Sequence, residues 1–297
     1  MAEEIGNTLI KDLELGDEMI TIQKSKPISE GLELLQSKNI RTLGVTDDHG
    51  DCLVGLITAF DIMTYICFGA YQITDINSDI DIKSAMKSLD VPIGNVTGLF
   101  HKETNRIWHF NESDPISNTY EAMCLGVHQA AIACEGDKLK LLSQHDLVKF
   151  LMKHGDVFNT NKTLEEAELA KPSTVTTIED EKLALLAFRR METSGNPALP
   201  VVDSSNQVVA TISASDVRKI STDNIACVLK PIPDFLVCAH GNLPKAMTCT
   251  ASSTVADVMK QLTDNYHRHA WVVDGDGKLV TSLSLSDLLD YCLQPRA

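Results

Sequence analysis

The sequence has little positive charge for its length. Its 297 residues carry 41 acidic and 26 basic side chains, which gives a formal net charge of -15. Because binding to a nucleic-acid backbone needs clustered lysine and arginine, this balance argues against nucleic acid as a general partner. It leaves room for a small anionic ligand, since charges more than about 8 Å away are largely screened at physiological salt and a local basic cluster can act alone.

Cysteine pairs of the Cys-x-x-Cys type are absent, although the chain has eight cysteines. The chain begins Met-Ala-Glu-Glu, and no apolar segment of a secretory signal follows. Disulfides are rare in reducing compartments, so we expect reduced thiols here. The same features predict a cytoplasmic location, with the nucleus as the alternative.

Motifs of common enzymes are also missing. The sequence has no Gly-x-Ser-x-Gly, Walker A or His-Glu-x-x-His pattern. His267 and His269 resemble a metal-ligand pair, but no third ligand accompanies them at the spacing of a metal site. The sequence leaves Cys–His catalysis open as an alternative, but nothing singles out one of the eight cysteines as a nucleophile. We predict a protein that is not an enzyme and has no metal site or catalytic cofactor.

The sequence also lacks a clear membrane-spanning segment. The run from Leu53 to Tyr71 holds one charge, Asp61, and is nearly long enough for a transmembrane helix. Gly55 and Thr58 interrupt it early, and a carboxylate in mid-span costs roughly 2.5–3.5 kcal/mol on insertion scales. A buried strand at 52–57 followed by a buried helix explains the run better, so we predict no membrane span.

What the sequence does contain is a fourfold internal repeat. Each copy ends with an apolar strand, the pattern [Ser/Thr]-x-x-Asp and an apolar helix start. The four segments are 53–61, 139–146, 208–216 and 279–287. Their final residues, Asp61, Asp146, Asp216 and Asp287, are separated by 85, 70 and 71 positions. The longer first interval indicates an insertion near residues 67–99.

Upstream of each such segment, the sequence predicts a helix, a strand and a turn. Apolar residues recur at helical spacing in repeat 4 at Val255, Val258, Met259 and Leu262. Repeats 1 and 3 have the same stripe, and repeat 2 has a looser one. The strands that follow lie at 43–45, 131–133, 199–202 and 271–273, and polar turns close them. The order helix, strand, turn, strand, helix therefore occurs four times, which predicts an α/β fold.

Pairing of the repeats follows from their size. A unit of about 60 residues buries its apolar face poorly alone. The polar stretch 153–162 separates repeats 1 and 2 from repeats 3 and 4. We therefore predict a first pair at residues 10–155, with repeats at about 10–68 and 90–155, and a second pair at residues 160–297, with repeats at about 165–222 and 240–295.

The repeated [Ser/Thr]-x-x-Asp pattern has two interpretations. A hydroxyl at the N-cap with an acid three residues later forms a capping box, which satisfies free N–H groups of the helix. The same junction exposes N–H groups and a hydroxyl to a phosphate, and its acid can accept ribose hydroxyls. The motif alone does not separate the two. The hydroxyl residues are Thr58, Ser143, Ser213 and Ser284.

A second repeated position adds charge. Six residues before the end of each first strand lie Arg41, His128, Pro197 and Arg268, and three of these can be cationic. Two or three charge-assisted hydrogen bonds of about 1.5–3 kcal/mol each would hold a nucleotide phosphate. Solvated basic residues at helix ends are the alternative. Repeat 3, with Pro197, is expected to bind phosphate least well.

These motifs resemble the CBS-domain family in all four repeats. Within that family, the chain is most similar to the gamma regulatory subunit of AMP-activated protein kinase and its plant and fungal relatives. The segments that carry the resemblance are 39–45 with 53–61, 126–129 with 142–151, 198–203, and 267–274 with 284–287, together with Arg106-Ile-Trp-His-Phe before repeat 2.

The resemblance implies two paired, Bateman-type CBS modules in a disk, with adenine nucleotides in central clefts. It implies ribose-binding roles for the four aspartates and the four hydroxyl residues above. Phosphate contacts are implied for Arg41, His128, His145, Arg268 and His269. In repeat 4 the family's His-Arg order corresponds either to Arg268-His269 or, with a shift of one, to His267-Arg268. Gln129 stands where a second basic residue is common.

The function implied is an AMP-, ADP- and ATP-sensing regulatory subunit of a serine/threonine kinase complex. Its partners would be kinase alpha and beta subunits, or a second copy in a CBS-mediated homodimer, with the adenine nucleotide as a regulatory ligand. The alternative is a non-sensing CBS scaffold that regulates a phosphatase or a metabolic enzyme.

Overall fold

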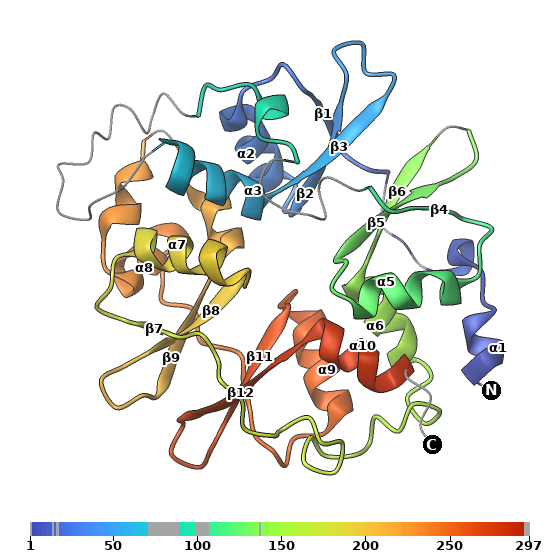
Figure 1. The fold of residues 1–297 in the computed structure, drawn as a ribbon, viewed down its shortest axis with the longest axis vertical. Coiled ribbons are helices and arrows are strands. Elements are labelled where there is room, and N and C mark those ends of the chain that lie inside the picture. Colours follow the sequence, from blue (N-terminus) through green and yellow to red (C-terminus); the bar gives the residue numbers. More distant parts are fainter. Residues whose placement is uncertain are drawn as a thin grey trace.

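The computed structural model describes residues 2–13, 15, 18–70, 89–98, 107–136, 138–221 and 223–293. Four α/β units lie around a disk, in the order first, second, fourth and third repeat (Figure 1). Most of the insertion expected near 67–99 lies outside the described residues, as does Arg106. The predicted α/β class with four repeats in a disk is confirmed.

Each repeat contains one three-stranded sheet whose middle strand is parallel to the first and antiparallel to the third. The strands are β1 (Thr21–Gln23), β2 (Thr42–Thr46) and β3 (Leu53–Thr58) in repeat 1; β4 (His109–Asn111), β5 (Gln129–Ala133) and β6 (Leu139–Ser143) in repeat 2; β7 (Ile178–Glu179), β8 (Ala198–Val202) and β9 (Val208–Ser213) in repeat 3; and β10 (Thr248–Cys249), β11 (His269–Val273) and β12 (Leu279–Ser284) in repeat 4.

The helix before each middle strand buries the stripe that its sequence predicts. These helices are α2 (Ile28–Ser37), α7 (Ala184–Ser194) and α9 (Val255–Asp264). In α9 the buried set includes Val255, Val258, Met259 and Leu262. The loose stripe of repeat 2 gives only a 3-10 turn, Ile116–Thr119, and the short α5 (Tyr120–Cys124).

A second helix follows each third strand. These are α3 (Ala59–Thr64), α6 (Gln144–Met152), the 3-10 helix η5 (Ala214–Lys219) and α10 (Leu285–Leu293). The strand-then-helix interpretation of the apolar run 53–71 is therefore confirmed. Within the described part of the chain, no helix has both the length and the apolar content that crossing a bilayer requires.

Shorter elements connect the repeats. They are α1 (Ala2–Gly6), the 3-10 turns Ile10–Asp12, Ile93–Asn95 and Ile225–Leu229, the π-helical turn Tyr65–Ala70, and α8 (Ile232–His240). The last of these, α8, lies between repeats 3 and 4 and becomes important below.

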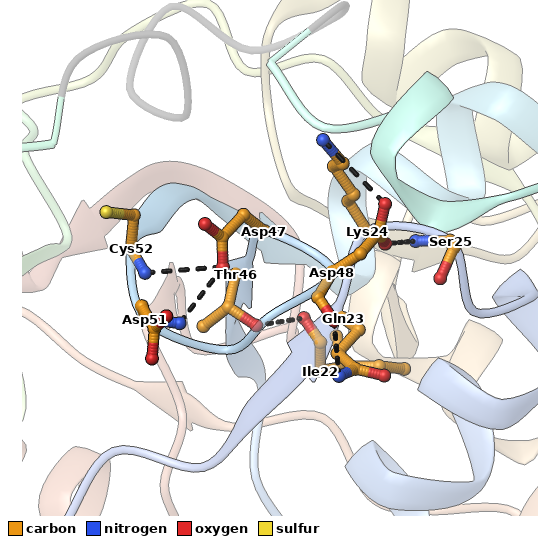
Figure 2. Close-up of polar contacts among 9 residues, drawn as sticks. All are labelled: Ile22, Gln23, Lys24, Ser25, Thr46, Asp47, Asp48, Asp51 and Cys52. Atoms are coloured by element: carbon orange, nitrogen blue, oxygen red, sulfur yellow. Dashed lines mark hydrogen bonds and ion pairs between the residues drawn. The ribbon is translucent and has the colours of Figure 1, made fainter.

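The turn between the second and third strands uses the same aspartate chemistry in several repeats. In repeat 1 the Asp47 side chain accepts from the backbone N–H groups of Asp51 at 3.0 Å and Cys52 at 3.4 Å, and Asp48 accepts from the N–H of Ser25 (Figure 2). Asp203 and Asp274 bind their own turns in the same way. A short carboxylate that bonds the backbone ahead of it stabilises a turn, so the predicted polar turns close the hairpins.

Two hydrophobic cores join repeats that are distant in sequence. The first core combines α2 and α3 of repeat 1 with α7, η5 and α8 of repeat 3. The second combines α5 and α6 of repeat 2 with α9 and α10 of repeat 4. The sheets make the other contacts: Leu56 packs on Ala131 between repeats 1 and 2, and Trp271 donates to Thr211 between repeats 4 and 3.

One expectation about the cysteines is wrong. Cys227 and Cys238 form a disulfide, whereas the other six cysteines are not disulfide-bonded. The pair lies 11 residues apart, and the turn between the 3-10 helix Ile225–Leu229 and α8 brings the two side chains together. This spacing matches no short cysteine motif, so sequence patterns do not predict the pair.

Candidate functional site

The predicted basic position is structurally equivalent in all four repeats. Its residue directly precedes the middle strand, and its carbonyl accepts the N–H of the first helical residue after the third strand. The four bonds are Ala59 to Arg41 at 3.3 Å, Gln144 to His128 at 3.1 Å, Ala214 to Pro197 at 2.9 Å and Leu285 to Arg268 at 3.0 Å. Arg268, and not His267, is therefore the counterpart of Arg41, which decides between the two alignments of repeat 4.

The four aspartates all form capping boxes with their own helices. One carboxylate oxygen accepts from the N–H of the cap residue, at 2.9 Å in Thr58–Asp61 and Ser143–Asp146 and at 2.7 Å in Ser213–Asp216 and Ser284–Asp287. The capping interpretation is confirmed at every copy. A ligand role would have to use the second carboxylate oxygen.

The four basic positions meet at one central cavity of about 300 Å³, which residues of all four repeats line. Small-molecule sites have volumes of about 300–1,000 Å³, so a compact ligand fits. Seven of the predicted site residues line this cavity: Arg41, Thr58, His128, Ser213, Asp216, Arg268 and His269.

The other predicted site residues do not line the central cavity. Asp61 is completely buried, and Asp287 is exposed elsewhere on the surface. Ser143, Asp146 and Ser284 are likewise not part of the lining. His145 is buried behind the wall, where its Nε2 lies 2.9 Å from the carbonyl oxygen of His267. The fourfold motif therefore does not give four equivalent sites around this cavity.

Repeat 3 contributes differently from what its sequence suggested. Pro197 brings no charge to the cavity, as expected. However, Asp216 of the same repeat is the only acid among the described residues that line it. The arginines of the lining come from neighbouring repeats, as Arg41 of repeat 1 and Arg268 of repeat 4.

Crowding of cations makes the cavity wall strongly electropositive. Desolvation, together with the nearby charges of Arg268 and Arg218, lowers the pKa of Arg41 to about 9. The Arg41 guanidinium donates to the carbonyl of Tyr266, and Arg218 donates to the carbonyl of Ile40 at 2.8 Å. Asp216 partly offsets the charges of Arg41 and Arg218, because its carboxylate raises the pKa of both.

The buried histidines are neutral at physiological pH. Burial, together with the charges of Arg41 and Arg268, lowers the pKa of His145 to about 3. Burial likewise lowers the pKa of His269 to about 3, assisted by His128 and Arg268. A neutral imidazole can offer a phosphate a hydrogen bond but no positive charge.

Several lining residues lie outside the repeated pattern, and the sequence did not single them out. They are Thr211, His240, Lys245 and Tyr266. His240 Nε2 lies 2.9 Å from Oδ1 of Asp216. Because His240 and Lys245 belong to the connection between repeats 3 and 4, comparing the repeats with one another gives no signal for them. Among the described residues, no cluster of three His, Cys, Asp or Glu side chains is placed to hold a metal ion.

Comparison with known proteins bears on two of the repeats. Residues 10–67 and 242–294 match the family model of the CBS domain. The four sheets, two of them in the matched segments, are consistent with four CBS repeats that form two paired modules.

Curated relatives of this chain are distant and longer. Protein SDS23 of Vanderwaltozyma polyspora is 26% identical over 222 residues, which cover 69% of this chain and 42% of the relative. Protein SDS23 of Yarrowia lipolytica is 24% identical over 290 residues, which cover 88% of this chain and 56% of the relative. The chain thus spans about half the length of the curated relatives it matches.

Solved structures share the fold of the whole disk. A Methanocaldococcus jannaschii protein, proposed to be an archaeal homologue of g-AMPK, aligns with a TM-score of 0.75 at 16% identity, covering 96% of this chain and 99% of that one. A conserved protein of Pyrococcus horikoshii aligns with a TM-score of 0.56 at 16% identity, covering 95% and 99%. At these identities the likeness shows the fold alone.

Proposed function

We propose that this CBS protein is a regulatory subunit that binds a phosphate-bearing ligand of the adenine-nucleotide class in its central cavity. One observation carries the proposal: Arg41, His128 and Arg268, from three different repeats, face one cavity. The mutual repulsion of its arginines, which contributes to the lowered pKa of Arg41, would be relieved by an anion. Charge-assisted hydrogen bonds to phosphate are the strong class of such contacts.

The partner that we propose is a phosphatase or a metabolic enzyme. The curated relatives described above carry the name SDS23 and not that of a kinase subunit, which favours the alternative over the kinase gamma reading. The likeness to the archaeal protein concerns the fold and carries no weight for the partner. We propose a cytoplasmic or nuclear location for the complex, and a non-catalytic role for the chain itself.

Isothermal titration calorimetry with AMP, ADP and ATP tests the ligand. We expect heat of binding from at least one nucleotide, and an affinity at least about tenfold lower for Arg41→Met, which removes one charge-assisted contact. Arg190→Met is the matched control, because Arg190 is exposed and pairs with Glu179 away from the cavity. If no nucleotide gives heat, the chain is the non-sensing scaffold instead.

Purification of the tagged full chain from its source tests the partner. Recovery of a phosphatase or metabolic enzyme in stoichiometric amount would support the proposal. Recovery of kinase alpha and beta subunits would contradict it and restore the kinase reading, and a stoichiometric second copy of the chain alone would indicate a CBS-mediated homodimer.

A further inference from the structure

The acid in the central cavity has both of its carboxylate oxygens engaged. Oδ2 of Asp216 accepts from the N–H of Ser213 at 2.7 Å and from its hydroxyl at 3.2 Å. Oδ1 lies 2.9 Å from Nε2 of His240. The Asp216 residue is only 8% exposed, so solvent offers little competition for these contacts.

The histidine that takes Oδ1 is held firmly in place. His240 is the last residue of α8, and the apolar face of α8, with Phe235 and Leu236, is buried in the first core. Two residues before His240, the disulfide from Cys238 to Cys227 ties this end of α8 to the preceding 3-10 helix. The imidazole therefore sits on a rigid support.

This arrangement distinguishes repeat 3 from two of its counterparts. Within the described residues, the carboxylates of Asp146 and Asp287 bond only to their own cap residues. At Asp216, His240 from outside the repeat contacts Oδ1, the carboxylate oxygen that makes no capping bond. That oxygen is the one that a sugar hydroxyl would need, because a carboxylate reads ribose by accepting hydrogen bonds from its hydroxyls.

We propose that His240 is a specificity-determining residue that occupies the sugar-reading position of Asp216. The central cavity would then hold the phosphate of its ligand without reading the ribose hydroxyls. A ribose hydroxyl would have to share Oδ1 with the imidazole that already contacts it, or displace that imidazole, which would then lose its own partner. This inference rests on the proposed nucleotide-class ligand and specifies how that ligand is selected.

Calorimetry with AMP and 2′,3′-dideoxy-AMP tests the inference on the full chain. We expect the wild-type protein to bind the two ligands with affinities within about twofold, since no hydroxyl contact is lost. In His240→Ala, Oδ1 of Asp216 becomes available to a ribose hydroxyl. We then expect the affinity for AMP to exceed that for the dideoxy analogue by about tenfold or more, which corresponds to one charge-assisted hydrogen bond.

Two further variants separate the contact from a general disturbance. His109→Ala is the control, because His109 is exposed on β4 and outside the cavity lining. It should behave as the wild type does. His240→Gln keeps a side-chain donor at the same place and should retain the wild-type indifference to ribose, with a thermal melt of each variant showing that it is folded.

The possible outcomes are distinct. A wild-type preference for AMP of tenfold or more overturns the inference while leaving nucleotide binding intact, and this comparison needs no variant. Gain of AMP preference in His240→Ala supports it, even if the wild type binds weakly. If neither ligand binds to any form, the proposed function fails and the inference fails with it.

Discussion

At the scale of single residues, the neutral histidines around the cavity link stability to pH. His145 and His269 have pKa values lowered to about 3 in the folded protein, whereas an unfolded histidine has a pKa of about 6.5. Below pH 6.5 the unfolded chain takes up protons that the folded chain refuses. The stability that these two residues provide is therefore complete above pH 6.5 and is lost as the pH falls towards 3.

This linkage gives a measurable loss. We expect each of the two histidines to lower the free energy of unfolding by about 1–2 kcal/mol between pH 7 and pH 5, measured by urea unfolding. His269→Phe, which keeps the ring stacked on Trp271, should flatten the pH dependence by one histidine's share. His109→Phe at an exposed position is the control. Parallel curves for wild type and His269→Phe would contradict the assigned pKa.

At the scale of elements, the repeated junction serves capping everywhere and faces the central cavity at only some copies. Ser284 and Asp287 cap α10 without lining the cavity, whereas Ser213 and Asp216 cap η5 and do line it. The two roles can therefore be separated by comparing the same substitution in two repeats.

Ser284→Ala and Ser213→Ala make that comparison. Loss of an N-cap hydroxyl costs about 1 kcal/mol of stability, so both variants should unfold at lower temperature by a similar amount. Only Ser213→Ala should also weaken nucleotide binding in calorimetry. An equal effect of Ser284→Ala on affinity would mean that ligand binding extends to the junction of repeat 4.

The helices and strands could largely be predicted from the sequence, because the same pattern recurs in each repeat. Stripes at helical spacing gave α2, α7 and α9, and the capping pattern gave the start of the following helices. What could not be predicted was set by tertiary contacts. The contact between His240 and Asp216 depends on how α8 packs, which no sequence pattern shows, and Asp61 is buried where its motif suggested a ligand contact.

At the scale of the whole molecule, each repeat has one neighbour through its sheet and another through its helices. Repeats 1 and 2 meet through their sheets, and so do repeats 3 and 4. The large cores instead join repeat 1 to repeat 3 and repeat 2 to repeat 4 (Figure 1). A sequence pattern shows which face of a helix is apolar but not which partner covers it, so this second pairing was beyond sequence reasoning. The predicted boundary at 153–162 stays a prediction.

Cutting the chain at that boundary tests how the disk is held together. Residues 1–156 would carry one side of both cores, including Leu32, Ile62 and Leu147, and residues 157–297 the other. Exposing a fully buried aliphatic side chain costs about 1.5–3 kcal/mol, and single domains retain only about 5–15 kcal/mol of stability. We therefore expect neither fragment to be a cooperatively folding monomer.

Mixed together, the two fragments should form a 1:1 complex whose mass and unfolding temperature, measured by light scattering and calorimetry, approach those of the intact chain. A monomeric fragment 1–156 that unfolds cooperatively near that temperature would show that the sheet contacts suffice and that the shared cores add little. Because the central cavity draws Arg41 and His128 from one fragment and Asp216 and Arg268 from the other, nucleotide binding should appear only in the mixture.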